Sequence, residues 1–352
     1  MRIVVTGATG NIGTHLLQVL RADPVVDSVV GLARRLPERR DPEVEWQQAD
    51  VTTTDLVPLL RGADAVVHLA FLLQPAHDPD LMHRTNVFGS RRVFDAVAAA
   101  GVPALVHASS VGAYAPGRGE VLTEAHPATG ISSSTYSRHK ASCETELDRL
   151  QQEHPDLRIV RIRPGVVLSA PAASALARYF LGPFVPQSLV RRALLPVLPD
   201  IPNLALQAVH SADVARAFAL AATGRLSGAF NVAADPVLTP ATLAAILGAR
   251  LVPVPRAGAR ALLAMSWHLR LQPTDPGWLD LGTSGLVMDI TRARTELGWA
   301  AEHDAAQTVR EVVAAMGRGQ GRDTPVLRPR ATGLSRWQEA ARGLLPGAGG
   351  TG

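Results

Sequence analysis

The chain has 352 residues, 47% of them hydrophobic, and a formal net charge of +4 at pH 7. Such a composition can bury one large core or two smaller ones, and its apolar runs are shorter than the roughly 18 residues that a membrane span needs. Beyond residue 316 there are six arginines and two acidic residues, so the excess charge belongs to the tail, and the neutral remainder argues against a nucleic-acid partner.

The cysteine count and the N-terminus bear on the cellular compartment. Cys143 is the single cysteine, so the chain cannot form an internal disulfide, as is usual in reducing compartments. Residues 1–6 pass directly into a glycine-rich sequence, without the apolar region of a signal peptide. We therefore expect a cytoplasmic protein with no membrane span.

The first predicted strand, residues 1–6, leads through a glycine-rich turn into a helix with apolar spacing over residues 15–20. Three glycines spaced by three residues allow a tight turn and let backbone N–H groups approach a pyrophosphate at the helix N-terminus. Because the motif follows a strand and opens a helix, it predicts dinucleotide binding. The residues expected at this contact are Gly7, Thr9, Gly10, Asn11, Ile12 and Gly13.

The second predicted strand, residues 28–33, ends in Arg34 and Arg35. An NAD-selective site commonly has an acidic residue here for the ribose hydroxyls, whereas arginine suits the 2′-phosphate of NADP. We therefore favour NADP over NAD, with Arg34 as its contact. Arg39 and Arg40 follow closely, so a solvated basic loop is the alternative.

Two further strands are predicted at residues 44–49 and 63–69, with a short helix over residues 54–61 between them. Asp50, at the end of the first of these strands, can receive the adenine amino group or cap that helix. Both interpretations stay open. A long helical pattern follows over residues 80–100.

The fifth predicted strand, residues 104–108, brings Ser109 and Ser110 to its carboxyl end, where open α/β sheets bind ligands. The hydroxyl of Ser110 can hydrogen-bond a substrate oxygen there. Serines that follow a strand also serve simply as turn formers, which is the alternative for this position.

Lys140 is the only lysine of the chain, while the other 34 basic side chains are arginines. It follows Tyr136, one of three tyrosines, by four residues, so on a helix the two side chains share a face. A neighbouring ammonium favours phenolate and lowers the pKa of a tyrosine, which would make Tyr136 a usable general acid or base. The alternative is an ordinary pair on a solvated helix.

A sixth strand is predicted at residues 158–163, and the alternation of strands and helices predicts an α/β fold. We expect a Rossmann-type, doubly wound parallel sheet with helices on both faces, and a smaller, mostly helical C-terminal substrate lobe. The expected dinucleotide-binding domain comprises residues 1–170, with residues 213–235 returning to it. The expected substrate lobe comprises residues 171–212 and 236–316, and it includes a proline-rich lid or pocket wall over 171–202. A basic Gly/Pro/Arg-rich extension is expected over residues 317–352.

Taken together, the motifs resemble those of the extended short-chain dehydrogenase/reductase superfamily, in its NAD-dependent epimerase/dehydratase family, over about residues 1–316. In chain order the motifs are residues 6–13, Asp50-Val51, His68-Leu69-Ala70, Asn86-Val87-Phe88-Gly89, Ser109-Ser110, Tyr136 with Lys140, Arg163-Pro164-Gly165, Val209-His210 with Asp213-Val214-Ala215, and Leu297-Gly298-Trp299.

The resemblance implies hydride transfer between C4 of a nicotinamide and a carbinol or ketone carbon. Tyr136 would exchange the hydroxyl proton, Lys140 would hold the nicotinamide ribose, and Ser110 would orient the substrate oxygen. It implies no metal, a small-molecule substrate and, as one assembly that suits it, a homodimer. The further cofactor contacts that it implies are Val51, Leu69, Ala70, Asn86 and Pro164, together with Tyr136 and Lys140.

The substrate is left open between a sugar nucleotide and a more lipophilic alcohol or ketone. Sugar-nucleotide 4,6-dehydratases carry an acidic pair after the serine or threonine, where this chain has Val111 and Gly112, so dehydration is not expected. The asparagine that many sugar-nucleotide epimerases have after the sixth strand is missing from residues 165–168. A protein that senses the dinucleotide without catalysis is the alternative from another class.

Overall fold

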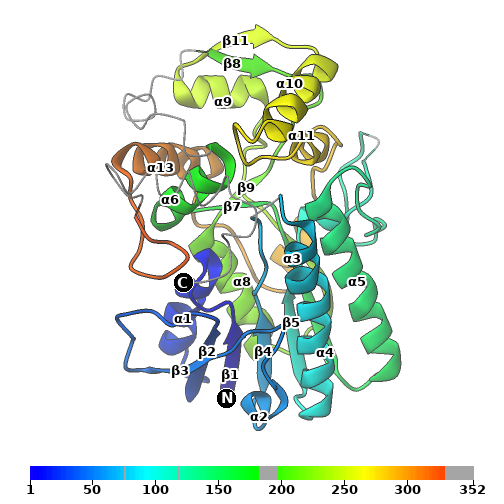
Figure 1. Cartoon of the computed structure of the whole chain (residues 1–352). Coiled ribbons are helices and arrows are strands. Elements are labelled where there is room, and N and C mark those ends of the chain that lie inside the picture. The colour runs from blue at the N-terminus through cyan, green and yellow to red at the C-terminus, as the bar shows by residue number, and fades with distance from the viewer. Residues whose placement is uncertain (75–76, 118, 182–196, 330–352) are drawn as a thin grey trace.

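The protein is described by a computed structural model over residues 1–74, 77–117, 119–181 and 197–329 (Figure 1). Part of the predicted lid, residues 182–196, and residues 330–352 of the predicted extension lie outside this description. Within the described ranges, no helix combines the length and apolar character that crossing a membrane requires.

Seven parallel strands form one sheet, which confirms the predicted fold class. The chain winds from β1 to β3 towards one edge and from β4 to β10 towards the other, so the direction of winding reverses between β1 and β4. In spatial order the strands are β10 (Gly228–Val232), β6 (Arg158–Pro164), β5 (Ala104–Ala108), β4 (Ala65–His68), β1 (Arg2–Thr6), β2 (Ser28–Ala33) and β3 (Val44–Gln48).

Helices cover both faces of this sheet (Figure 1). On one face α1 (Asn11–Ala22) packs against α8 (Ser211–Thr223), and on the other α4 (Gly89–Ala99) packs between α2 (Val57–Leu60) and α5 (Thr135–Glu153). The alternation of side chains along β1 separates the two cores. Ile3 and Val5 belong to the core with α1 and α8, while Val4 belongs to the core with α4 and α5.

The connections after β3 and β4 differ in detail from the sequence-based expectations. The backbone N–H of Asp50 donates to Thr54 Oγ1, and its carboxylate accepts from the backbone and hydroxyl of Thr52. Because of this turn the helix begins later in the chain than predicted, so α2 is shorter than the predicted helix. Its N-cap is Leu56, without a side-chain bond, and the interpretation of Asp50 as the helix cap is therefore wrong. The long helical pattern is built of α3 (Pro79–His83), a π-helical turn (Arg84–Phe88) and α4.

The remaining elements lie mostly beyond the carboxyl edge of the sheet (Figure 1). Two short parallel pairs were not predicted from the sequence, β7 (Val166–Leu168) with β9 (Ala208–His210), and β8 (Val197–Asp200) with β11 (Arg250–Pro253). The helices here are α6 (Ala173–Leu176), α9 (Pro240–Leu247), α10 (Arg256–His268), α11 (Gly277–Gly282), α12 (Thr291–Thr295) and α13 (Ala305–Arg318). The domain boundaries given above remain a prediction.

Candidate active site

A cavity of about 580 Å³ opens at the carboxyl ends of the strands, next to the paired strands β1 and β4, between which the direction of winding reverses. Such switch points are where doubly wound sheets bind ligands. All but one of the site residues predicted from the sequence line this cavity. They are Gly7, Thr9, Gly10, Asn11, Ile12, Gly13, Arg34, Asp50, Val51, Leu69, Ala70, Ser110, Tyr136, Lys140 and Pro164.

The glycine turn between β1 and α1 is packed too closely for side chains. Gly7 has a φ of +70°, and a Cβ atom there would lie 2.7 Å from the backbone nitrogen of Ala70. A Cβ atom at Gly13 would lie 2.5 Å from the carbonyl oxygen of Gly7. The N-cap of α1, Gly10, makes no side-chain capping bond, so the N–H groups of the first helical turn remain available for an anion in the cavity.

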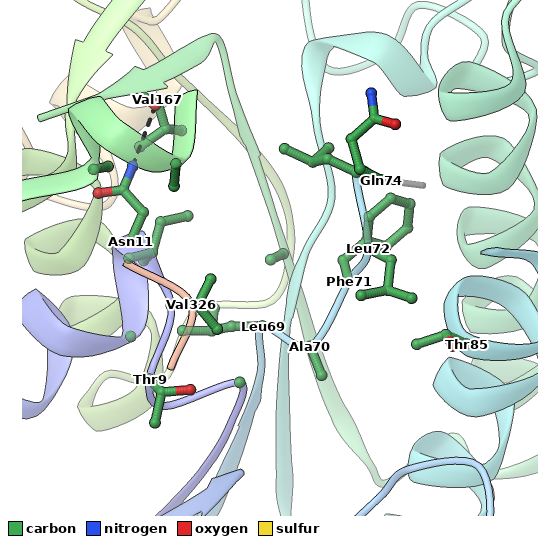
Figure 2. A pocket seen from close by; sticks show the side chains of 18 of the residues that line it. Thr9, Asn11, Leu69, Ala70, Phe71, Leu72, Gln74, Thr85, Val167 and Val326 are labelled. Carbon is green, nitrogen blue, oxygen red and sulfur yellow. Dashed lines mark hydrogen bonds between the residues drawn. The ribbon is translucent and has the colours of Figure 1, made fainter. Parts of the chain in front are cut away.

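Asn11 has a structural task that the sequence did not indicate. Its amide nitrogen donates to the carbonyl oxygen of Val167 at 3.3 Å (Figure 2). Its amide oxygen accepts from the hydroxyls of Ser169 and Ser211, both at 2.7 Å. These bonds join the start of α1 to the segments after β7 and β9, so the Asn11 side chain links the glycine turn to the elements above the sheet.

Asn86 is the predicted contact that does not line the cavity. It is fully buried, and its amide pairs with both backbone groups of Leu72, with Oδ1 accepting at 2.7 Å and Nδ2 donating at 2.9 Å. This pairing fixes the segment after β4, which carries Phe71 and Gln74 into the cavity (Figure 2). Asn86 therefore shapes the wall of the cavity from behind.

Arg34 and Asp50 lie at the far end of the cavity from Tyr136, beyond the ends of β2 and β3. The Arg34 side chain is exposed, and its backbone oxygen accepts from Gln48. Among the described residues, none of the His, Cys, Asp and Glu side chains group in a way that could hold a metal ion.

Tyr136 lies in the first turn of α5 and faces Ser110. Removal from water raises the pKa of the Tyr136 phenol to about 12, while a hydrogen bond with Ser110 opposes that rise. The expectation that Lys140 lowers the pKa of Tyr136 is wrong for this structure, because Ser110, and not Lys140, is the group that opposes the effect of burial. The Ser110 oxygen also accepts from the backbone N–H of Gly112 at 3.0 Å, which fixes its position.

Lys140 is 4% exposed, one helical turn after Tyr136. Its ammonium donates to the backbone oxygen of Ala108 at 2.6 Å and lies 3.6 Å from the centre of the Phe71 ring. The distance to the Tyr136 ring centre is 5.9 Å. Burial lowers the pKa of Lys140 to about 8. A buried ammonium beside an aromatic face is held in place by cation–π attraction.

A buried ion pair supports the serine end of the site. Glu144, 2% exposed, accepts from Arg163 Nε at 2.8 Å and from the hydroxyl of Ser109 at 2.5 Å. These donors and the charge of Arg161 hold the pKa of Glu144 below its ordinary value despite its burial. Glu144 is thus an ion-pairing residue.

Aromatic side chains surround Tyr136, and the sequence did not indicate them. Trp278 stacks on the Tyr136 ring at 4.8 Å between ring centres, and Phe71 meets it edge-on at 5.6 Å. Phe180 packs edge-on against Trp278 at 5.1 Å. Only 4% of the chain is aromatic, so a cluster of these aromatic side chains is unusual for this composition. Its members come from four distant segments, and no local spacing could have revealed it.

Comparisons with known proteins agree with this geometry. The sequence model of the NAD dependent epimerase/dehydratase family matches residues 3–233. The chain is 26% identical to the sterol-4-alpha-carboxylate 3-dehydrogenase (decarboxylating) of Saccharomyces cerevisiae over 260 residues, which cover 70% of this chain and 68% of that protein. It is 30% identical to the L-arabinose 1-dehydrogenase (NAD(P)(+)) of Haloferax volcanii, over 60% of this chain and 89% of that protein. It is also 30% identical to the ceramide reductase of Caulobacter vibrioides, over 60% and 58% of the two chains.

Among solved structures, the UDP-glucose 4-epimerase of Thermus thermophilus in complex with NAD has a TM-score of 0.66 at 24% identity. The match covers 91% of this chain and 99% of that chain. At this identity the likeness establishes the fold. Together with the family match over more than half of the sequence, it shows that the chain belongs to the NAD-dependent epimerase/dehydratase family of extended short-chain dehydrogenases/reductases.

Proposed function

We propose that the protein is an NAD(P)-dependent oxidoreductase that interconverts an apolar ketone and its alcohol. The observation that carries this proposal is the aromatic enclosure of Tyr136 by Phe71 and Trp278, in the same cavity as Ser110 and the glycine turn. An apolar wall with few polar groups at the reacting end suits a substrate whose body is apolar.

The residues present fit a dinucleotide. The cavity extends from Arg34 and Asp50, through the glycine turn at the N-terminus of α1, to Lys140 and Tyr136. A pyrophosphate at that helix terminus would place the nicotinamide end towards Tyr136 and the adenosine end towards Arg34. The exposed guanidinium of Arg34 and the lack of an acid at the end of β2 support NADP as the preferred cofactor.

The proposed chemistry assigns one role to each catalytic side chain. When bound, the nicotinamide ring exchanges a hydride with the substrate carbon. Tyr136 gives its hydroxyl proton to the substrate oxygen in reduction and takes it back in oxidation. Ser110 donates a hydrogen bond to the same oxygen and stabilises its developing negative charge. Burial raises the pKa of Tyr136 to about 12, so the phenol carries its proton at neutral pH and can donate it to a ketone oxygen.

In the part of the chain that the structure describes, the substrate side of the cavity offers little to the diphosphate of a sugar nucleotide. Arg178, which lines the cavity, donates from both terminal nitrogens to the backbone oxygens of Val326 and Arg328. Two further arginines of the predicted lid, Arg191 and Arg192, lie outside the described residues. Two of the relatives are named for a sterol and a ceramide, which supports an apolar substrate for this chain.

Gly112 argues against a 4,6-dehydratase. A Cβ atom at this position would lie 2.8 Å from Cε1 of Tyr136. An acidic residue in place of Gly112 would therefore displace the tyrosine ring. The close approach of the ring to the backbone supports a site that holds Tyr136 for proton transfer to a substrate oxygen and has no separate acid beside it.

The direct test mixes the pure protein and NADPH, or NADH, with a panel of apolar ketones and, separately, with UDP-glucose. We expect the absorbance of the reduced nicotinamide to fall with at least one apolar ketone. Conversion of UDP-glucose without net consumption of the cofactor would instead identify an epimerase. Dinucleotide binding without turnover of any compound would favour the alternative of a non-catalytic sensor.

Tyr136→Phe removes only the proposed proton donor. We expect it to lower kcat by about 100-fold or more, while the affinity for the dinucleotide stays near that of the wild type. Tyr114→Phe is the control for loss of a buried tyrosine hydroxyl that does not line the cavity. Because this hydroxyl bonds Asn231 and Arg163, we expect the control to lose stability and not to lose kcat to this extent. Turnover by Tyr136→Phe at the wild-type rate would contradict the assignment.

A further inference from the structure

The segment after α13 returns to the glycine turn. Gly319, with a φ of +64°, ends the helix, and residues 319–329, here called the C-terminal strap, run down beside α1 (Figure 1). The hydroxyl of Thr324 donates to the carbonyl oxygen of Thr9 at 2.9 Å, across 315 positions of sequence. Both side chains are at least nine-tenths buried, so this bond is shielded from water.

The strap is a compact loop with an apolar anchor. The backbone nitrogen of Arg322 donates to the oxygen of Leu327 at 2.7 Å, which closes the loop. Leu327 is 2% exposed and packs in a cluster with Leu176 and with Val312 of α13. The loop is tight, since a Cβ atom at Gly321 would lie 2.4 Å from the Leu327 oxygen. Its shape is therefore fixed by contacts at both ends.

Further contacts connect the strap to both sides of the cavity. Arg178 donates to the backbone oxygens of Arg328, at 2.9 Å, and Val326, at 3.1 Å. Arg328 forms an ion pair with Glu38, in the connection that follows Arg34. The strap thus bridges the segment after α6 and the loop after β2, passing over the glycine turn between them.

Pro325, Val326 and Leu327 form part of the cavity wall together with the glycine turn and Leu69 (Figure 2). With these residues in place, the cavity still measures about 580 Å³, well within the range of roughly 300–1,000 Å³ of small-molecule and cofactor sites. The strap is therefore a wall of the cavity and not a plug that fills it.

We propose that the C-terminal strap is part of the dinucleotide site, where Val326 covers the pyrophosphate at the glycine turn and the strap must lift before the cofactor can leave. This inference rests on the proposed function, since it takes the ligand to be a dinucleotide. Opening of the strap then limits cofactor release, and the bond from Thr324 to Thr9 and the burial of Leu327 set the rate of opening.

The test compares two double variants of the full chain. Thr324→Val/Leu327→Ala removes the bond to Thr9 and the apolar anchor. The control, Thr308→Val/Val309→Ala, removes a hydrogen bond and buried methyl groups from α13 at positions that do not line the cavity. Preformed complexes with NADPH and with NADH are mixed with excess oxidised cofactor, and the loss of nicotinamide fluorescence gives the dissociation rate. We expect release about tenfold faster in the strap variant and unchanged in the control.

A wild-type protein that binds neither dinucleotide would overturn the proposed function and this inference with it. If the wild type binds and the folded strap variant releases the cofactor at the wild-type rate, only the inference on the strap is wrong. Val326→Asp and Val326→Asn give a second test that leaves the anchor in place. A carboxylate beside a pyrophosphate should weaken binding several-fold more than the amide of similar size. Equal affinities of these two variants would also overturn the inference.

Discussion

Lys140 carries a cost in stability that its proposed role explains. The ammonium is buried, with one backbone hydrogen bond and an aromatic face as its nearest partners, and its pKa falls to about 8. A charge in such surroundings destabilises the folded state relative to an apolar side chain of similar shape. A structural role alone does not account for the one lysine of the chain standing here.

We predict that Lys140→Met stabilises the protein by about 1–2 kcal/mol at pH 7 while it abolishes turnover. Below pH 8 Lys140 is charged in both the folded and the unfolded state, so burial of the charge destabilises the folded wild type to its full extent. Between pH 8 and about 10.4 the unfolded chain binds more protons, and the stability of the wild type rises with pH. Thermal unfolding should therefore show that the difference in stability between the variant and the wild type becomes smaller from pH 8 to 10. A variant less stable than the wild type at pH 7 would disprove this.

Arg34 is the residue on which the preference for NADP depends. Because its side chain is exposed, a contact with a 2′-phosphate is partly screened by water. We expect Arg34→Ala to weaken NADP binding by about 3- to 10-fold and to leave NAD binding nearly unchanged. Arg40→Ala is the control, an exposed arginine in the same loop that does not line the cavity. Titration of each variant with NAD and with NADP measures both affinities. Equal losses of affinity for NAD and NADP in Arg34→Ala would contradict the preference for NADP.

At the scale of elements, the junction of β1 and α1 depends on glycines, because there is no room for a side chain at these positions. A Cβ atom at Gly13 would meet the Gly7 oxygen at 2.5 Å and the Ala8 backbone at 2.8 Å. Neither backbone group can give way without moving α1. We predict that Gly13→Ala lowers the free energy of unfolding by about 1–3 kcal/mol and weakens dinucleotide binding at least tenfold.

The matched control for Gly13→Ala is Gly258→Ala. Gly258 lies in α10, and a Cβ atom there would meet nothing within 4 Å. Alanine favours the helix at an open position, so this variant should be neutral or more stable by up to about 1 kcal/mol. Thermal unfolding and dinucleotide titration of both variants check the pair. A Gly13→Ala protein that binds like the wild type would show that α1 adjusts without cost.

The sequence predicts the elements whose side chains repeat with a local period or follow a strand directly. The glycine turn, Ser110 and the pair of Tyr136 and Lys140 are of this kind, and all line one cavity. β7 and β9 were missed because each has three residues, too few for a periodic pattern. The pairing of Asn86 with Leu72 was not predicted, because its partner is a backbone and the identity of the side chains does not reveal such a bond.

At the scale of the whole molecule, contacts between distant segments were beyond prediction. The aromatic enclosure joins residues 71, 136, 180 and 278, and the strap joins residues 9 and 324. The composition of the tail predicts a basic Gly/Pro/Arg-rich extension, and it does not reveal that Thr324 and Leu327 in its first part are buried. Such contacts depend on how the lobes pack, and no local pattern encodes them.

Buried neutral histidines make the whole molecule sensitive to acid. Burial lowers the pKa of His68 to about 3 and of His139 to about 4, and it lowers the pKa of His107 well below its ordinary value. In the unfolded chain these groups titrate near pH 6.5. Below that pH the unfolded state binds more protons, so stability falls as the pH falls. Each such histidine should remove about 2 kcal/mol between pH 7 and pH 5.

His107 is the position at which this sensitivity can be removed. It is 1% exposed, it stacks on His68 at 5.4 Å, and neither ring nitrogen has a hydrogen-bond partner among the described residues. Leucine is similar in volume and has no nitrogen to leave unpaired. We predict that His107→Leu is about 1 kcal/mol more stable than the wild type at pH 7, and that it loses about 2 kcal/mol less between pH 7 and pH 5. Urea unfolding at the two pH values measures both quantities. If the two proteins lose equal stability over this range, His107 is already charged in the folded state or is not a source of the sensitivity to acid.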